Sequence, residues 1–345
     1  MSRKLRVIQW TTGNIGSRAL HGILARDDME LVGVYAHSAA KVGKDAAELC
    51  GHAEPTGVLA TDDVSALLAL RPDACSYNPV WSNTDELCRL LEAGVNVCST
   101  AEWINGRRLP AAERDRVLEA ALRGGASIFG SGAFPGLTHA LAIVSSSACE
   151  RVDRITVTES VDCSRYASGD TMSAMGFGRP ADSPGLEENL RKASEVCAEA
   201  ALMMADALGV QVDRMSFEAT FTAAHGDDDL GFMTITKGGV GAIEGHHRAW
   251  SGGRNVTASG VRWVMGTHTD PPFRLAHGHV ISIEGSPNYR LLAQCLPPRG
   301  TADYMGPGMI YTAMPAVNAI PSVVAAEPGI VSYPDLPYIT GPVLG

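Results

Sequence analysis

Two glycines near the start of the chain have the spacing of a phosphate-binding turn. In the segment QWTTGNIGSRAL, Gly13 and Gly16 follow the apolar run LRVIQW and precede a helical pattern. In such a strand–turn–helix, the first of these glycines lets the backbone approach a pyrophosphate, and the second lets the helix pack closely on the strand. Thr11 stands where the usual G-x-G-x-x-G pattern begins with glycine. We therefore predict that the amides of Asn14 and Ile15 hold a dinucleotide at the helix N-terminus.

The elements around this turn alternate between strand and helix. Short runs rich in β-branched residues, such as MELVGVYA and VNVCST, are separated by segments with helix signals. Asn83 and Glu86 have the spacing of a capping box, and Gly94 is a helix stop. This repetition predicts an α/β fold with a Rossmann-type doubly wound parallel sheet. The alternative for the glycine pattern is a tight turn without a ligand, but a strand before it and a helix after it favour a cofactor site.

The end of the second predicted strand bears on which dinucleotide is bound. An NAD site usually has an acidic residue there, about 20 residues after the glycines, to bind the ribose 2′-hydroxyl. This chain reads YAHSAAK instead, so His37, Ser38 and Lys41 are available for a 2′-phosphate. We predict NADP, with NAD as the other possible cofactor. The alternative for these three residues is a solvated loop.

Three further strand ends carry polar residues, in the segments YNPVW, STAEW and GSGAFPG. Ligands of doubly wound sheets bind beyond the carboxyl ends of the strands. Glu102 is the one acid directly after a strand end, and Trp103 follows it. A carboxylate beside an aromatic ring in a dry cleft has a raised pKa and can exchange protons near neutral pH. The alternative is a solvated loop glutamate. The candidate cofactor-binding residues are Thr12, Gly13, Asn14, Ile15, Gly16, His37, Ser38, Lys41, Asn78, Pro79, Ser99, Thr100 and Asn318.

The second half of the chain has a different pattern. The run RVDRITVTESVDC alternates, so one polar face, which we expect to line a cleft, contains Thr156, Thr158, Ser160 and Asp162. Residues 164–185 are rich in Gly, Ser and Pro, which predicts a long loop that orders over the ligand. The segment LEENLRKASEVCAEAALMMADALG then predicts one long helix, and the later segments predict an antiparallel sheet.

These patterns divide the chain into two domains. We assign residues 1–137 to a dinucleotide-binding domain, on which residues 310–345, an apolar helical pattern broken by two prolines, pack back. Residues 138–309 form a second α+β domain with a mainly antiparallel sheet, which binds the substrate and forms the dimer interface. The strands within residues 215–284 have no helix in their own sequence to cover an apolar outer face, which predicts a homodimer.

Composition and charge exclude several classes of protein. The chain has 345 residues, of which 45% are hydrophobic and 19% charged, as in ordinary globular proteins. Its net charge of −10 disfavours nucleic acid as a partner. The absence of a long apolar stretch or signal peptide predicts a cytoplasmic protein without a membrane partner. The eight cysteines form no C-x-x-C pair, and HGDDD is a polar turn, so no metal site is expected.

Five segments spread over most of the chain carry a resemblance: VIQWTTGNIG, LVGVYAHSAAKVGKDAAELCG, GVNVCST, GSGAFPG and TAMPAVNAIPSVVAAEPGI. Together they resemble the superfamily with a dihydrodipicolinate-reductase-type N-terminal domain. More narrowly, the chain is similar to the 2,4-diaminopentanoate dehydrogenase and native amine dehydrogenase branch. The resemblance implies reversible reductive amination, in which a small ketone or aldehyde and ammonia are reduced by NAD(P)H through an imine. It also implies a catalytic glutamate just after the VST strand, a position that Glu102 matches.

The chain departs from this family at two places. The diaminopentanoate enzymes read roughly E-E-L-x-x-P where this chain reads AEWING, and the family's G-T-G-x-N-P-G is GSGAFPG here. Both changes favour a more apolar pocket. The candidate substrate-pocket residues are Trp81, Trp103, Phe134, His139 and Tyr166.

Two other functions remain open from the sequence. One is an NADP-dependent C=C or C=O reductase of the same superfamily, in which Glu102 is structural; it would turn over without ammonia. The other is a non-catalytic NADP sensor with a protein partner. The GHHRAW segment is similar to the H-H-R stretch of true dihydrodipicolinate reductases, but the lysine and D-A-P-S-G-T-A segment that should follow are missing. We therefore expect His246 and His247 to be structural.

Overall fold

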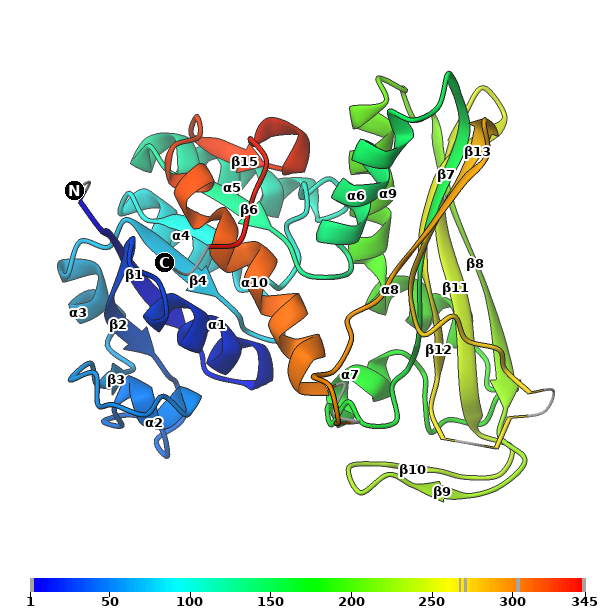
Figure 1. Ribbon diagram of the computed structural model, residues 1–345, viewed down its shortest axis with the longest axis horizontal. Helices are drawn as coiled ribbons and strands as arrows, with labels where there is room; N and C mark the ends of the chain where they lie inside the picture. The colour runs from blue at the N-terminus through cyan, green and yellow to red at the C-terminus, as the bar shows by residue number, and fades with distance from the viewer. Residues whose placement is uncertain (1–2, 267, 270–271, 302–304, 343–345) are drawn as a thin grey trace. The chain divides into compact units, whose positions relative to one another are not determined.

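The chain folds into two compact units in the computed structural model (Figure 1). Met1–Leu137 and Gly306–Gly345 form the first unit, and Thr138–Met305 form the second. The structure describes residues 3–266, 268–269, 272–301 and 305–342.

A parallel sheet of seven strands forms the centre of the first unit, in the order β15-β6-β5-β4-β1-β2-β3. These strands are β1 (Leu5–Trp10), β2 (Met29–Tyr35), β3 (Ala60–Thr61), β4 (Ala74–Tyr77), β5 (Asn96–Ser99), β6 (Ser127–Gly130) and β15 (Gly329–Val331). All their registered pairs are parallel, which confirms the predicted doubly wound sheet. The strand order reverses between β1 and β4, and ligands of such sheets bind at this switch point.

The first unit also contains α1 (Asn14–Leu24), α2 (Ala46–Cys50), α3 (Val64–Ala69), α4 (Thr84–Glu92), α5 (Ala111–Gly124), α10 (Met305–Val324) and the 3-10 turn Tyr333–Asp335. Half of the predicted capping box of α4 is present, because the Asn83 side chain accepts hydrogen bonds from the amides of Asp85 and Glu86. The other half is not, since the Asn83 amide donates to the Tyr77 hydroxyl. The predicted break of the C-terminal helix is wrong, since α10 runs through Pro315 and Pro321. Its buried face packs in a hydrophobic cluster of the first unit, which offsets the loss of two backbone donors.

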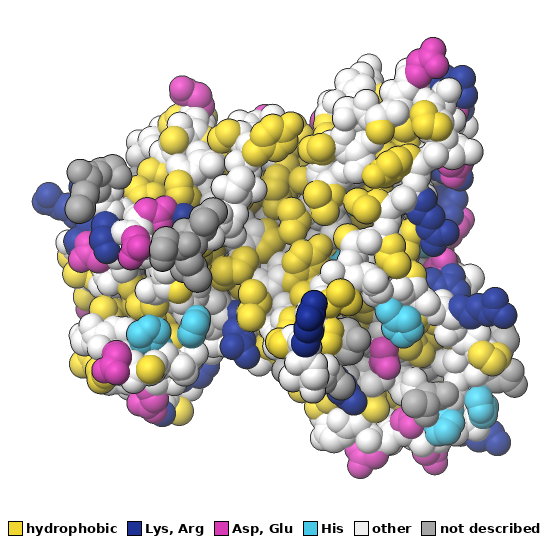
Figure 2. Space-filling view, in the orientation of Figure 1, with side chains coloured by type: hydrophobic (Ala, Val, Ile, Leu, Met, Phe, Trp, Pro, Cys, Tyr) yellow, Lys and Arg dark blue, Asp and Glu magenta, His cyan; other side chains and the backbone are white. Residues whose placement is uncertain are grey.

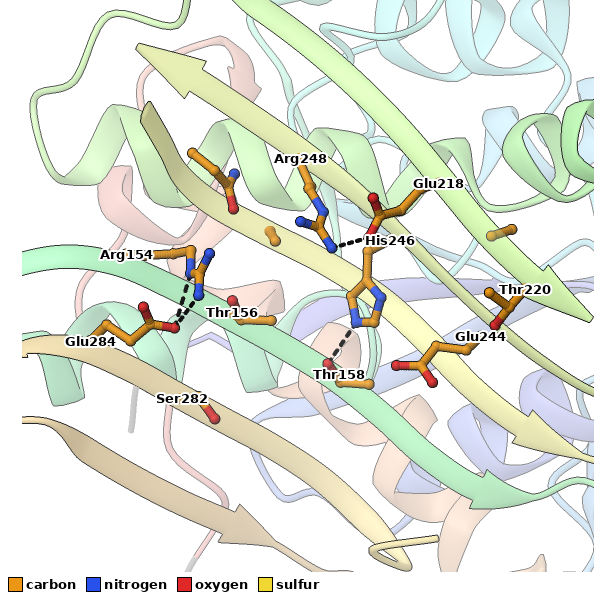
Figure 3. Close-up of a pocket in the computed structure, with 13 residues that line it drawn as sticks. Arg154, Thr156, Thr158, Glu218, Thr220, Glu244, His246, Arg248, Ser282 and Glu284 are labelled. Carbon is orange, nitrogen blue, oxygen red and sulfur yellow. Dashed lines mark hydrogen bonds and ion pairs between the residues drawn. The ribbon is translucent and has the colours of Figure 1, made fainter. Parts of the chain in front are cut away.

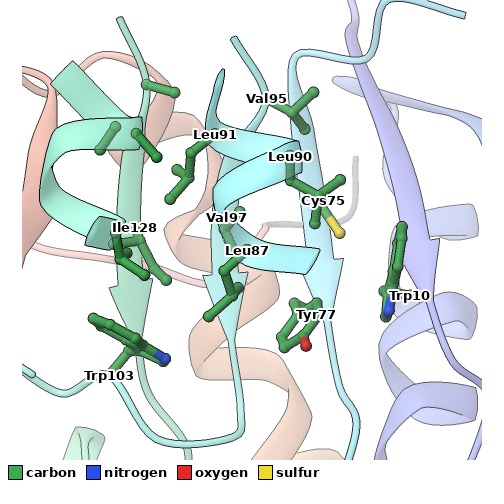
Figure 4. Close-up of a cluster of buried hydrophobic side chains, with 14 of the residues drawn as sticks. Trp10, Cys75, Tyr77, Leu87, Leu90, Leu91, Val95, Val97, Trp103 and Ile128 are labelled. Carbon is green, nitrogen blue, oxygen red and sulfur yellow. The ribbon is translucent and has the colours of Figure 1, made fainter. Parts of the chain in front are cut away.

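One core cluster of this unit shows how its helices are fixed on the sheet (Figure 4). Leu87, Leu90 and Leu91 have the spacing that places side chains on one face of α4. They are fully buried, and the same cluster contains Tyr77 of β4 and Val97 of β5. This packing fixes the strands whose carboxyl ends carry the candidate site residues.

The second unit is built on a sheet of six strands in the order β14-β13-β7-β12-β11-β8. These are β7 (Arg151–Asp162), β8 (Arg214–Ala223), β11 (Val240–Ser251), β12 (Arg254–Val264), β13 (Gly278–Ser286) and β14 (Tyr289–Ala293), with a separate pair β9 (Asp228–Asp229) and β10 (Thr234–Ile235). The pair β7–β12 is parallel and the other registered pairs are antiparallel, which confirms a mainly antiparallel sheet. Its helices are α6 (Leu137–Ser146), α7 (Gly169–Ala174), α8 (Leu186–Ala193) and α9 (Glu195–Ala207).

The two faces of this sheet differ in polarity. The helices of the unit lie on one side of it (Figure 1), where Ile155 and Val157 of β7 are fully buried. The opposite, open face carries alternate residues such as Thr156 and Thr158. The predicted apolar outer face is therefore wrong, because alternation turns the apolar residues of these strands toward the helices.

Two local predictions in this unit are corrected. Residues 164–185 are not a structureless loop, since they contain α7, and Met172, Met175 and Phe177 are buried. The predicted single helix is divided at Ser194, where α8 ends and α9 begins. The Ser194 hydroxyl donates to the Leu190 carbonyl, at 2.6 Å. A serine side chain that bonds to its own helix backbone competes with helix continuation.

The surface mixes acidic and basic side chains, as Figure 2 shows for one face. Within the described ranges, none of the helices combines the length and hydropathy needed to span a bilayer. The same residues contain no group of three His, Cys, Asp or Glu side chains placed to hold a metal ion.

Candidate active site

The glycine turn joins β1 to α1 at the carboxyl end of β1. Thr11 has a φ of 65°, a left-handed conformation that is unfavourable for a β-branched residue. Its hydroxyl donates to the Asn78 carbonyl at 2.8 Å, and the Gln9 side-chain amide donates to the Thr11 carbonyl, also at 2.8 Å. These two hydrogen bonds hold a threonine in a conformation that glycine usually supplies.

The geometry of this turn fits a pyrophosphate. A Cβ on Gly16 would lie 2.5 Å from the Thr11 carbonyl oxygen, so glycine is required there. A Cβ on Gly13 would meet nothing within 4 Å, so its backbone faces open space. No side chain caps α1, which leaves its first amides available to an anion. The buried Thr12 hydroxyl has no partner in the described part of the chain, so a ligand could bond to it.

The loop after β2 returns to the glycine turn through Lys41. Its ammonium group donates to the Thr12 carbonyl at 2.8 Å, and its amide donates to the Ser38 carbonyl, also at 2.8 Å. His37 is exposed and Ser38 is partly buried. The loop therefore places the Lys41 ammonium group beside the candidate phosphate site and leaves the exposed His37 side chain accessible to a ligand.

Sequence reasoning missed a hollow of about 450 Å³ beside α1. Asn14, Arg18 and His21 of α1 line it, together with Met309 from the start of α10. The spacing of Asn14 and Arg18 places both side chains on one helix face. This spacing could have identified Arg18 from the sequence as a neighbour of the glycine turn. Met309 carries no such signal, because only the tertiary fold brings α10 to this position.

Asn78 ties together the strand ends at the switch point. Its Nδ2 donates to the Thr100 hydroxyl at 2.9 Å, and its Oδ1 accepts from Gln9 Nε2 at 2.7 Å. Ser99 differs from its predicted role, because it is fully buried and its hydroxyl donates to the Ala101 carbonyl at 2.5 Å. Ser99 is thus occupied in shaping the turn before Glu102 and is not available to a ribose. Pro79, beside Asn78, is partly buried.

Glu102 lies just beyond the carboxyl end of β5 in an unusual turn. Its φ is 56° and that of Trp103 is 65°, so two consecutive non-glycine residues are left-handed. A Cβ on Gly130, at the end of β6, would lie 2.2 Å from the Glu102 carbonyl oxygen. The Ser82 hydroxyl, on the loop after β4, donates to Glu102 Oε2. Backbone strain of this kind persists where the surrounding structure imposes it and concentrates at functional sites.

Three predicted site residues lie elsewhere than expected. Trp103 is fully buried in a core cluster, so it does not form a pocket wall. His139 is fully buried with its Nε2 2.8 Å from the Ser259 hydroxyl oxygen, and burial, aided by His279, lowers its pKa to about 3. A neutral, enclosed imidazole of this kind is a structural residue. By contrast, Trp81 is 58% exposed, and Phe134 and Tyr166 are partly exposed.

Asn318 is the third predicted site residue that lies elsewhere than expected. Its side-chain oxygen accepts from Arg26 Nη1 at 2.8 Å. Arg26 follows the C-terminal end of α1, whereas the glycine turn precedes the N-terminal end. Asn318 therefore bonds to a residue at the opposite end of α1 from the glycine turn, which does not support its predicted contact with the cofactor.

A hollow of about 700 Å³ lies on the open face of the second-unit sheet (Figure 3). Arg154 bonds to Glu284, and Arg248 bonds to Glu218. His246 Nε2 lies 2.9 Å from the Thr158 hydroxyl, and burial lowers the pKa of His246. None of the candidate cofactor or pocket residues lines this hollow, so it is a separate, charged surface.

Comparisons with known proteins agree with this geometry. The family model of the 2,4-diaminopentanoate dehydrogenase C-terminal domain matches residues 137–343. An amine dehydrogenase from Streptomyces virginiae is 30% identical over 360 residues, which cover 96% of each chain. The structure of an amine dehydrogenase from Mycobacterium smegmatis has a TM-score of 0.80 at 20% identity, covering 99% of this chain and 98% of that one. GenD2 from gentamicin A biosynthesis, in complex with NAD, has a TM-score of 0.56 at 14% identity, covering 93% and 87%.

The uncapped helix behind an open glycine turn, at the switch point of a doubly wound sheet, has the geometry that fits a nicotinamide dinucleotide. The protein is an NAD(P)-dependent oxidoreductase that acts on a small molecule. It belongs to the 2,4-diaminopentanoate dehydrogenase family, in the amine dehydrogenase branch.

Proposed function

We propose that this chain catalyses the reversible reductive amination of a small ketone or aldehyde with ammonia. The observation that supports this most is the placement of Glu102. The Glu102 carboxylate accepts a hydrogen bond from the Ser82 hydroxyl. The Glu102 backbone is left-handed, and its carbonyl packs closely against Gly130. The name of the Streptomyces virginiae relative, amine dehydrogenase, supports the same reaction class.

Glu102 has three tasks in this proposal. It accepts a proton from ammonium so that free ammonia attacks the carbonyl carbon, and it assists the loss of water that gives the iminium. Its negative charge then stabilises the iminium, which accepts a hydride far better than a neutral imine. When bound, a nicotinamide would supply the hydride in this direction and accept it in the reverse one.

A panel of primary amines tests this function. The protein should reduce NADP⁺ at alkaline pH, where the amine is largely unprotonated, and the rate should depend on the amine. In the reverse direction, NADPH oxidation with the matching carbonyl compound should require ammonium. NADPH oxidation at the same rate without ammonium would instead support the C=C or C=O reductase.

The cofactor preference is a separate prediction. We propose that NADPH binds more tightly than NADH, because Lys41 lies at the glycine turn and no acid ends β2. An ammonium group has three donors, so its bond to Thr12 leaves others for a phosphate. Lys41→Gln should weaken NADPH binding about 10- to 100-fold and leave NADH binding unchanged.

Fluorescence titration of both cofactors measures these affinities. Lys44→Gln is the matched control, because Lys44 is in the same loop but pairs with Glu48. Equal affinity of the unmodified protein for NADH and NADPH would contradict the preference.

We further propose that the protein is a homodimer joined through the open face of the second-unit sheet. Arg154 and Arg248 alternate on this face with Glu218 and Glu284, so a second copy related by a twofold axis can place acids against bases. Thr156→Arg, which puts a large cation into the hollow, should give a monomer. Light scattering at micromolar concentration measures this, and a monomeric unmodified protein would exclude the dimer.

A further inference from the structure

The hollow beside α1 contains a cation that the glycine turn itself does not use. Arg18 and His21 of α1 line this hollow of about 450 Å³, and no Asp or Glu of the described ranges lines it. The first turn of α1 has no acidic residue either, although the helix dipole favours an acid there. The surroundings of Arg18 therefore lack a negative charge and are suited to an anionic ligand.

Arg18 has no bonding partner of its own in the part of the chain that the structure describes. Its side chain is partly buried, and its guanidinium makes neither a hydrogen bond nor an ion pair with a described residue. Arg26, just beyond the other end of α1, differs in this respect, because two of its nitrogens donate to the Asp28 carboxylate. All five donors of the Arg18 guanidinium are thus available to a ligand.

The position of Arg18 on α1 brings its side chain to the start of the helix. Arg18 follows Asn14, the first residue of α1, by one helical turn, and both line the hollow. One turn is about 5.4 Å along the axis, and the side chains of a helix lean toward its N-terminus. The long Arg18 side chain can therefore reach the first amides of α1. A cation and a helix N-terminus repel each other, but together they attract an anion more strongly than either does alone.

The opposite wall of the hollow leaves room for a ligand and adds no negative charge. Leu49, Cys50 and Gly51, at the end of α2, form this wall. A Cβ on Gly51 would meet nothing within 4 Å. Burial raises the pKa of the Cys50 thiol, so the thiol stays neutral near pH 7.

We propose that Arg18 is a further cofactor-binding residue, whose guanidinium bonds to the pyrophosphate of the nicotinamide dinucleotide from the outer face of α1. The assignment rests on a dinucleotide bound at the glycine turn and not on the proposed amine dehydrogenase reaction. Every residue that lines the hollow belongs to the first unit. NAD and NADP share the pyrophosphate, so Arg18 contributes equally to both, whereas Lys41 is proposed to favour NADPH.

Arg18→Gln tests this assignment in fluorescence titrations of NADH and NADPH. Glutamine removes the charge and the paired donors of the guanidinium, so both dissociation constants should rise by the same factor, about 10- to 100-fold. ADP-ribose, which has the pyrophosphate but no nicotinamide, should lose affinity by that factor in a calorimetric titration. Arg18→Lys should keep part of the affinity, because an ammonium group retains the charge but not the paired donors.

Arg123→Gln is the matched control, because it removes an exposed guanidinium of the same unit that pairs with Glu92. It should leave the three affinities unchanged. Unchanged binding of all three ligands to Arg18→Gln would overturn the assignment. A loss confined to NADPH would place Arg18 at the 2′-phosphate, and a loss that spares ADP-ribose would place it at the nicotinamide; each of these results overturns the assignment as well.

Thermal melting of the cofactor-free variants separates a lost contact from a lost fold. Arg18→Gln should melt like the unmodified protein, because Arg18 bonds to no described residue. A lower melting temperature, with a loss of affinity that Arg18→Lys does not partly restore, would make Arg18 structural and overturn the assignment. If the unmodified protein binds the dinucleotides but oxidises no amine, the proposed reaction fails, and the titrations still decide the role of Arg18.

Discussion

Glu102→Gln should lower amine oxidation and reductive amination together, by about 10²- to 10⁴-fold. Glutamine keeps the shape of the side chain and can still accept a hydrogen bond from Ser82. It cannot take a proton from ammonium, and it has no charge to stabilise an iminium. Cofactor affinity should stay the same, because the proposed pyrophosphate site is formed by Gly13 and the first amides of α1 and not by Glu102.

Steady-state kinetics in both directions and a fluorescence titration of NADPH measure this effect. Glu113→Gln is a suitable control, since Glu113 also accepts a hydrogen bond from a hydroxyl, that of Thr84, but lies on the exposed side of α5. Near-normal turnover of Glu102→Gln would favour a C=C or C=O reductase. Loss of cofactor binding along with activity would make Glu102 a structural part of the nicotinamide site.

Gly130→Ala should lower kcat about 100-fold while Glu102 itself is unchanged. The added Cβ would lie 2.2 Å from the Glu102 carbonyl oxygen and 2.4 Å from that of Trp103, so the turn must move. A displacement of about 1 Å at a reacting group is enough for a loss of this size. Gly130 is a positioning residue in this account, because it acts on the reaction only through the backbone of Glu102.

The matched control is Gly132→Ala. Its Cβ would come no closer than 3.5 Å to the Thr312 side chain, which is an ordinary contact. Thermal melting of both variants separates a local displacement from unfolding. A folded Gly130→Ala variant with unchanged kcat would show that the conformation of the Glu102 turn does not matter to the reaction.

Local sequence signals predicted the elements of the first unit well. The glycine spacing and the Asn83 cap depend on residues within one turn, so they can be read without knowing the tertiary fold. The same holds for Glu102 as a strand-end acid. The sequence does not predict the left-handed conformation of Thr11, because it depends on hydrogen bonds to Gln9 and to Asn78, which is distant in the sequence.

Predictions about which residues lie together were less successful. The apolar character of Trp103 suggested a pocket wall, but it is equally suited to the core in which it lies. Asn318 lies on a helix that does contribute to the surroundings of the glycine turn, but through Met309 at its other end. Sequence alone does not specify which end of α10 reaches the turn.

The second unit shows the same limit in its sheet. The alternation of β7 was predicted, and Thr156 and Thr158 do share a polar face. That face is the open one, where Thr156 and Thr158 line the hollow on the sheet. An alternating pattern separates two faces of a strand, but it does not say which of them a ligand meets.

Incorporation of ¹⁵N from ammonium into the product tests the amine dehydrogenase function most directly. The protein is incubated with NADPH, ¹⁵N-ammonium and the carbonyl partner of its best amine, and the product is analysed by mass spectrometry. We expect one labelled amine for each NADPH oxidised, and no NADPH oxidation when ammonium is left out. An alcohol or a saturated carbonyl compound as product, formed equally with and without ammonium, would contradict the proposed function.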